Sequence, residues 1–180
     1  MEIIKTHLEG LFVIQPTVFE DSRGYFFESY NETQFQQAGI SDKFIQDNQS
    51  KSQKGVLRGL HFQNPPFAQG KLVRVITGSV LDVALDIRAN SPTYGQHFTI
   101  ELTDQNKTML WVPPGFAHGF ATLKNDTIFS YKCTNLYNKE SEGCILWNDS
   151  NLNIDWKIDA PTLSKKDQIG TPFQNFNSLF

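Results

Sequence analysis

The sequence of 180 residues has only two cysteines, no run of basic residues and no long apolar segment, and each shortage excludes a class of protein. Cys133 and Cys144 lack the CxxC spacing of zinc ribbons, so we expect two reduced thiols rather than a disulfide or a metal site. The 16 basic and 19 acidic residues give a net charge of -3 without a basic cluster, which argues against a nucleic-acid partner. The apolar run 11–14 is too short for a signal peptide, and no stretch reaches membrane-spanning length. We therefore expect a cytoplasmic protein with no membrane partner.

Alternation of apolar and polar residues dominates what the sequence does contain. Segment 71–88 breaks at a Thr-Gly-Ser turn into two β-rich halves, and segment 96–102 alternates strictly. Turn-forming residues separate most of the further strands that we expect, which cover residues 10–18, 25–30, 55–63, 109–112, 119–123, 128–134 and 143–147. Several short strands at this spacing are typical of an all-β sandwich or barrel.

Helix signals are few, and nothing indicates a second domain. Asn31 followed by Gln34 resembles a capping box for a short helix that ends at Gly39, and Ser164 can cap a second short turn. The chain has no internal repeat, linker or low-complexity tract. With 39% hydrophobic residues it can bury one core, so we expect a single domain over residues 1–180.

Polar residues occur where a plain β-core would have apolar ones. GVLRGLHFQ, residues 55–63, places Arg58 and His61 among apolar neighbours. In TIFSYKCT the alternation sends Tyr131 to the face of Phe129, so its hydroxyl points inward and needs a partner. Lys71 is in phase with the apolar residues of its strand, so it either faces the interior or begins a solvated edge.

Each of these residues also has an ordinary structural explanation. His61 and His118 fit core or turn histidines, and Tyr131 alone fits a packed residue with its hydroxyl on a backbone carbonyl. Asp167 lies three residues after Ser164, where it can complete a helix cap. The charged residues of FEDSRGYFFESY fit exposed ion pairs. Considered singly, none of these positions decides the function.

Taken in order, the motifs resemble one family. FEDSRGYFFES, QDNQSKSQKGVLRGLHFQ, QGKLVRVITGSVLDVALDIR, WVPPGFAHGF, YKCTNLYNKESEG and LSKKD are similar to the dTDP-4-dehydrorhamnose 3,5-epimerase family over residues 3–168. The resemblance implies a cupin-type jelly roll, a homodimer, a sugar-nucleotide substrate and no redox cofactor. A ketone at C4 of the sugar makes the hydrogens on C3 and C5 acidic, so the site needs a base, an acid on the opposite face and a group that stabilises the enolate.

The resemblance also implies catalytic roles. It assigns His61 as the base, Asp167 as the carboxylate that orients His61, Lys71 as the group that stabilises the enolate, and Tyr131 as the proton donor on the opposite face. Arg58 would bind substrate beside His61. Because strand alternation sends Arg58 and His61 to opposite faces, one pocket for both requires a bulge or bend, most simply at Gly59.

The remaining matches concern substrate binding and assembly. The resemblance assigns substrate binding to Arg23, Glu28, Gln46, Asp47, Asn48, His118, Glu142 and Lys166 of LSKKD. The rings of Phe26 and Tyr137 offer stacking faces for thymine. Arginine suits a diphosphate because its planar fork donates two hydrogen bonds. The family suggests a dimer with exchanged N-terminal strands, in which Arg23 reaches the partner's site.

A metal is not expected, because Phe62 and Gln63 stand where a His-x-His cupin would hold a second ligand, and His61 with His118 alone makes a poor metal site.

Three alternatives to a double epimerase stay open at this point. A single-centre epimerase or a ketoisomerase differs only in the fate of the enolate. A non-catalytic sugar-binding cupin would need neither a base nor an acid.

Overall fold

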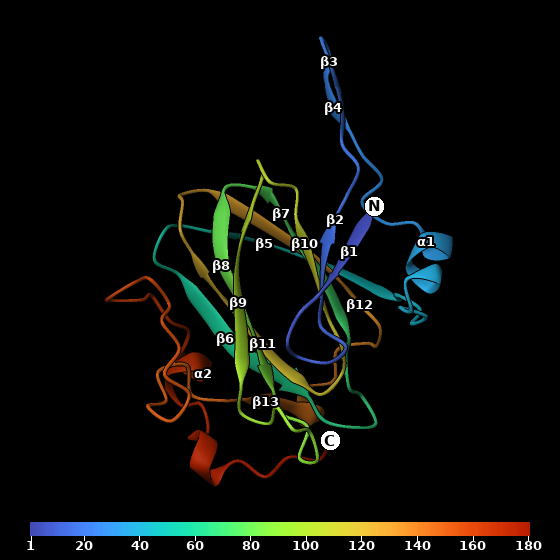
Figure 1. Ribbon diagram of the computed structural model, residues 1–180. Helices are drawn as coiled ribbons and strands as arrows, with labels where there is room; N and C mark the ends of the chain where they lie inside the picture. The colour runs from blue at the N-terminus through green and yellow to red at the C-terminus, as the bar shows by residue number, and fades with distance from the viewer.

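The computed structural model, which describes residues 1–180, consists of two antiparallel β-sheets packed face to face (Figure 1). The strands are β1 (Glu2–Lys5), β2 (Phe12–Gln15), β3 (Phe19–Asp21), β4 (Gly24–Phe26), β5 (Gln46–Ser52), β6 (Leu57–Gln63), β7 (Lys71–Thr77), β8 (Ser79–Asp86), β9 (His97–Thr103), β10 (Met109–Val112), β11 (Phe116–Thr122), β12 (Thr127–Cys133) and β13 (Glu142–Cys144). One sheet has the order β1-β2-β10-β7-β12-β5, and the other has the order β13-β6-β11-β8-β9. This architecture confirms the predicted all-β sandwich.

Three clusters of buried apolar residues hold the sandwich together, and the smallest, of six residues, packs Phe35 of α1 against Trp111 of β10 and its neighbours. One core of 13 buried residues lies between the sheets and includes Val73 and Phe129. A second core of 12 buried residues lies on the outer face of the five-stranded sheet, where Trp156 and the C-terminal segment cover it. Strand β8 is buried at every position because both of its faces are covered, which explains its nearly continuous apolar sequence.

The few helices are short and capped as predicted. Helix α1 (Glu32–Gln37) begins after Asn31, whose side chain accepts a hydrogen bond from the backbone of Gln34, and Gly39 ends the turn with φ +87°. Helix α2 (Lys165–Gln168) is capped by Ser164. The 3-10 turns are η1 (Lys139–Ser141) and η2 (Phe173–Asn175). None of the helices is long and apolar enough to cross a membrane.

The predicted strand over residues 25–30 is correct only at its first two residues. Strand β4 ends at Phe26 and pairs with β3 in a hairpin that projects away from the sandwich (Figure 1). The turn is stabilised by Asp21, which accepts a hydrogen bond from the backbone of Arg23 at 2.8 Å, and by Gly24, whose φ of +125° suits a residue without a side chain. Strands β1, β3 and β5 were not among the predicted strands.

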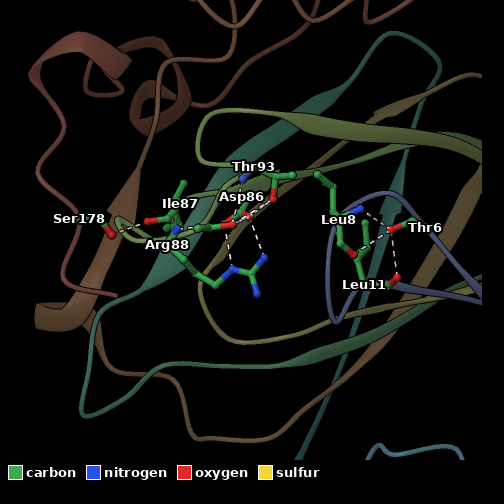
Figure 2. A network of polar contacts seen from close by, with 9 residues as sticks. Thr6, Leu8, Leu11, Asp86, Ile87, Arg88, Thr93 and Ser178 are labelled. Carbon is green, nitrogen blue, oxygen red and sulfur yellow. Dashed lines mark hydrogen bonds and ion pairs between the residues drawn. The ribbon is translucent and has the colours of Figure 1, made fainter.

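A buried polar network stands near the end of β8. The Asp86 carboxylate, which is fully buried, accepts hydrogen bonds from Arg88, Ser91 and Thr93, and Figure 2 shows its contacts with Arg88 and Thr93. The hydroxyl of Ser178 donates to the carbonyl of Ile87 beside it, which ties the C-terminal segment to this end of the strand. We refer to Asp86, Arg88, Ser91 and Thr93 as the Asp86 network.

Candidate active site

A cavity of about 720 Å³ opens between the two sheets. Eleven of the fifteen predicted site residues line it: Gln46, Asn48, Arg58, His61, Lys71, His118, Tyr131, Tyr137, Glu142, Lys166 and Asp167. They come from β5, β6, β7, β11, β12, β13, α2 and the loop before η1. The fold therefore brings together residues that are more than 100 positions apart in the sequence.

The predicted bulge in β6 is present at Gly59. His61 pairs with His118 of β11 and Arg58 pairs with Phe120. The two paired positions are three residues apart in β6 but only two residues apart in β11, so β6 contains one extra residue. The extra residue reverses the side-chain alternation and brings both Arg58 and His61 to the cavity. Gly59 has φ +136°, and a β-carbon there would lie 2.5 Å from the α-carbon of Gly119. Only glycine fits this position.

His61 and Asp167 form a tightly hydrogen-bonded pair. Nε2 of His61 lies 2.5 Å from Oδ1 of Asp167, and the same oxygen accepts a longer bond from the backbone of Gly59 at 3.3 Å. The other carboxylate oxygen accepts from the Ser164 hydroxyl at 2.6 Å, while the backbone of Asp167 donates back to Ser164. Asp167 therefore completes the helix cap and orients His61 at once. The two explanations considered from the sequence both apply.

The local environment sets the charge state of the pair. Burial lowers the pKa of His61, and the nearby cations Lys166 and Lys71 lower it further, against the opposing effect of Asp167. Burial alone would raise the pKa of Asp167, but hydrogen bonds from His61 and Ser164 outweigh it and bring that pKa below its ordinary value. At neutral pH the pair is therefore a neutral imidazole held by a carboxylate, which is the state required of a general base.

Tyr131 and Lys71 stand on the sheet opposite His61. They belong to the neighbouring strands β12 and β7 of the six-stranded sheet, whereas His61 belongs to the five-stranded sheet. Burial raises the pKa of Tyr131, so the phenol keeps its proton. Burial lowers the pKa of Lys71, whose ammonium group makes no ion pair or hydrogen bond with the protein. A neutral imidazole and a protonated phenol thus face the cavity from opposite walls.

The other lining residues form a polar rim. Lys166 donates to Glu142 at 2.6 Å, and the hydroxyl of Tyr137 donates to the same carboxylate at 3.2 Å. Gln46 donates to Asn48 at 3.1 Å and accepts from the backbone of Tyr137 at 2.9 Å. These contacts hold the Tyr137 ring at the mouth of the cavity, where 56% of the residue is exposed.

Four predicted substrate-binding residues lie outside this cavity. Arg23 and Phe26 are on the projecting hairpin, where Arg23 pairs with Asp21 and Phe26 is 67% exposed. Glu28 accepts hydrogen bonds from Asn31 and Gln34 at the start of α1. The structure contradicts a place for Asp47 in this cavity, because strand alternation puts it on the outer face of β5, where it pairs with Lys132.

Sequence reasoning missed a second histidine–carboxylate pair. Nε2 of His118 lies 2.9 Å from Oδ1 and 3.0 Å from Oδ2 of Asp82, a fully buried residue of β8. The available signal was a carboxylate inside the apolar run SVLDVALD. Gln63 was also missed as a loop anchor: it donates to the carbonyls of Phe67 and Leu136.

One group of side chains has the proximity of a metal site but not the chemistry. The ligand atoms of His61, Cys144 and Asp167 lie within 4.8 Å of one another. Burial and the charge of Asp167 raise the pKa of Cys144 to about 11, so the thiol is protonated at neutral pH, whereas metals bind the thiolate. Both oxygens of Asp167 already accept hydrogen bonds. Both cysteines are free, as predicted.

Comparison with known proteins places this cavity in a family. The profile described as dTDP-4-dehydrorhamnose 3,5-epimerase matches residues 5–175. The chain belongs to this epimerase family. The dTDP-4-dehydrorhamnose 3,5-epimerase of Shigella flexneri is 50% identical over 174 residues, which make up 96% of each protein. The protein is therefore an epimerase, of the isomerase class.

Solved structures of the same epimerase family agree with the fold. The enzyme of Elizabethkingia anophelis superposes with a TM-score of 0.94 at 52% identity, covering 98% of this chain and 99% of the other. The dTDP-6-deoxy-D-glucose-3,5-epimerase of Legionella pneumophila, solved in complex with dTDP-4-keto-L-rhamnose, has a TM-score of 0.94 at 46% identity and covers 98% of this chain and 94% of its own. The expected cupin-type jelly roll is confirmed.

Proposed function

We propose that this epimerase converts dTDP-4-dehydro-6-deoxy-D-glucose to dTDP-4-dehydro-L-rhamnose by removing and returning a proton at C3 and at C5. The observation that carries the proposal is the placement of a neutral His61 and a protonated Tyr131 on opposite walls of one cavity. Inversion of a carbon requires proton removal from one face and delivery to the other. A binding protein has no need of such a pair.

His61 abstracts each proton through the ring nitrogen that Asp167 does not occupy. The imidazolium that forms is stabilised by the Asp167 carboxylate 2.5 Å away, which also fixes the orientation of the ring. Lys71 lies on the opposite wall without an anionic partner, so its ammonium form can stabilise the negative charge that develops on the C4 oxygen. Tyr131 then delivers a proton to the opposite face.

The polar rim binds the nucleotide end of the substrate. Lys166 supplies positive charge for the diphosphate, and Gln46, Asn48, His118 and Glu142 supply hydrogen-bonding groups, whereas Arg58 binds the substrate beside His61. Tyr137 is held by its bond to Glu142 with most of its ring exposed, an arrangement suited to stacking on thymine. The chemistry needs neither metal nor redox cofactor. Elemental analysis of active enzyme before and after chelation tests that expectation.

The chain acts as one cytoplasmic domain that pairs into a homodimer by exchanging N-terminal strands. Three matched residues, Arg23, Phe26 and Glu28, lie outside the cavity of their own chain, and the hairpin that carries Arg23 and Phe26 exposes large apolar side chains. An exchanged hairpin would cover this surface and carry Arg23 to the partner's diphosphate site.

Subunit mixing tests the exchange. Arg23→Ala and His61→Ala chains are each expected to be nearly inactive, but their heterodimer regains one intact site when Arg23 comes from the partner. If Arg23 serves its own chain, every site in the mixture carries one lesion. In that case no activity returns, and the exchange is wrong. Sedimentation of the wild type gives the stoichiometry.

Solvent isotope labelling tests the reaction itself. In deuterated water, wild-type enzyme should place deuterium at both C3 and C5 of dTDP-4-dehydro-6-deoxy-D-glucose, as NMR of the product reports. His61→Ala should reduce exchange at both carbons by about 10²- to 10⁴-fold, the usual contribution of a general base. Tyr131→Phe keeps the ring but removes the hydroxyl, so exchange with retained configuration, or inversion at one centre only, is expected.

The labelling pattern also separates the alternatives. Label at a single carbon in the wild type would replace the double epimerase with a single-centre enzyme. Migration of the ketone to another carbon would indicate a ketoisomerase. Tight binding of the nucleotide sugar without any exchange would contradict catalysis altogether.

A further inference from the structure

One buried polar atom of the cavity wall has no hydrogen-bond partner in the protein. The hydroxyl of Ser50 is buried and makes no hydrogen bond, although the residue lines the cavity. Ser50 lies on β5 opposite Phe129, whose ring is 1% exposed in the core between the sheets. A buried hydroxyl without a partner costs free energy, so its position on the wall of a substrate cavity points to a ligand that bonds it.

The other polar residues on the same face of β5 all have partners. Gln46 bonds to Asn48, and the amide of Asn48 donates to the sulfur of Cys133 at 3.6 Å. Ser52 accepts two bonds from the Arg58 guanidinium, each at 3.3 Å. Ser50 is therefore the only one of four inward-facing polar residues on β5 without a partner. The polar character of the strand as a whole does not explain why this hydroxyl is unpaired.

Arg58 gives a second, independent sign that this part of the wall receives a ligand. Its guanidinium makes no ion pair, and its only hydrogen-bond partner is the hydroxyl of Ser52. Ser52, two positions from Ser50, thus anchors an exposed cation that lines the cavity, and most of the Arg58 donors have no partner within the protein. A cation without an anionic partner and a buried hydroxyl without a partner, both lining one cavity, suit an oxygen-rich ligand.

We propose that Ser50 is a substrate-binding residue whose hydroxyl hydrogen-bonds an oxygen of the hexose ring or of one of its hydroxyl groups. This deepens the proposed function and rests on it. We favour the sugar end of the substrate over the nucleotide end. Ser50 pairs with Phe129, a buried core residue two positions before Tyr131 on β12, so it lies deep in the cavity. The exposed Tyr137 ring, which we assign to the nucleotide, lies at the mouth instead.

Calorimetric titration of Ser50→Ala with dTDP and with dTDP-glucose tests the assignment. Neither ligand turns over, because neither carries a C4 ketone. We expect the variant to bind dTDP as the wild type does and dTDP-glucose about tenfold more weakly, with a similar fall in kcat/KM on the keto substrate. Its thermal midpoint should equal or exceed that of the wild type, since an unpaired hydroxyl is removed.

Thr122→Val is the matched control. The Thr122 hydroxyl is also buried without a partner, but the residue does not line the cavity, so this variant should bind both ligands normally. Ser50→Cys, which keeps the size of the side chain with a weaker donor, repeats the test if the alanine variant folds poorly.

Three outcomes would overturn the Ser50 assignment: unchanged affinity for dTDP-glucose, an equal loss for both ligands, or a clear loss of stability that indicates a bond within the free protein. A wild type that binds dTDP-glucose but does not epimerise dTDP-4-dehydro-6-deoxy-D-glucose would instead contradict the proposed function. The two binding curves would still decide the role of Ser50.

Discussion

Strand β8 carries two buried carboxylates four residues apart, and they stand in contrasting surroundings. Asp86 belongs to a network in which every polar partner is satisfied: it accepts bonds from Arg88, Ser91 and Thr93 and has no contact with the cavity. Asp82 instead bonds His118 on the cavity wall, where Lys71 has no partner and the Ser50 hydroxyl has none. The same strand therefore carries one buried carboxylate within a fully hydrogen-bonded network and one beside a cavity that holds unpaired polar groups.

The difference separates residues that stabilise the fold from residues kept for the reaction. Burial raises the pKa of Asp86, yet hydrogen bonds from Arg88, Ser91 and Thr93 outweigh it and bring the pKa to about 2. The folded state thus favours this charge. Burial lowers the pKa of Lys71 without an anion in contact to oppose it, so the folded state disfavours that charge. The cavity thus holds polar groups that have no partner within the protein.

Asp167→Asn should give the largest effect, and it acts on activity. We expect kcat/KM to fall roughly 10²- to 10⁴-fold, because the amide no longer stabilises the imidazolium of His61. Asp167 raises the pKa of His61, so its removal should move the acidic limb of the pH profile of kcat/KM to lower pH. The exposed Asp126 provides the control Asp126→Asn. A limb that stays in place would mean that another group is the base.

Asp86→Asn should give the next largest effect, on stability alone. Removing the charge leaves Arg88 without its anion in a buried network, at a cost of about 3 kcal/mol in the free energy of unfolding. In a chain of this size the thermal midpoint should fall by about 6 to 12 °C. Activity per folded molecule should be unchanged. A loss of kcat/KM without a loss of stability would break the contrast between the two regions.

The pH dependence of unfolding gives a smaller effect of the same network. The pKa of Asp86 is about 2 when folded and 3.8 ordinarily, so its stabilisation is present above about pH 4 and is lost as the pH falls through 2. The difference corresponds to about 2 kcal/mol. Urea unfolding at pH 2 and pH 5 should show the wild type and Asp86→Asn differing less at the lower pH. An equal difference at both would contradict the network account.

Sequence reasoning succeeded where one strong local pattern decided the structure. The alternation around Tyr131 placed its hydroxyl inward, and the conflict between Arg58 and His61 required the bulge that Gly59 provides. It failed for β5, because QDNQSKS contains no apolar residue. That strand lines a polar cavity and contributes no apolar side chain to the core between the sheets.

The remaining misses depend on tertiary structure. Asp82 is identified as part of the site only by its contact with His118 on the neighbouring strand. The outward position of Asp47 follows from the strand that was missed, because the alternation of β5 places Gln46 and Asn48 inward and Asp47 outward. The role that we propose for the hairpin with Arg23 depends on a second chain, which no local pattern describes.

The unfolding free energy of Lys71→Met tests the contrast most directly. Methionine retains an apolar side chain of similar length and removes the unpaired charge, so urea unfolding should show a gain of about 1 kcal/mol, while the same preparation loses hydrogen exchange at C3 and C5. Lys51→Met, at an exposed lysine that pairs with Asp126, should change neither quantity. A Lys71→Met protein that is less stable than the wild type would show that the lysine supports the fold, and would contradict the division between the two regions.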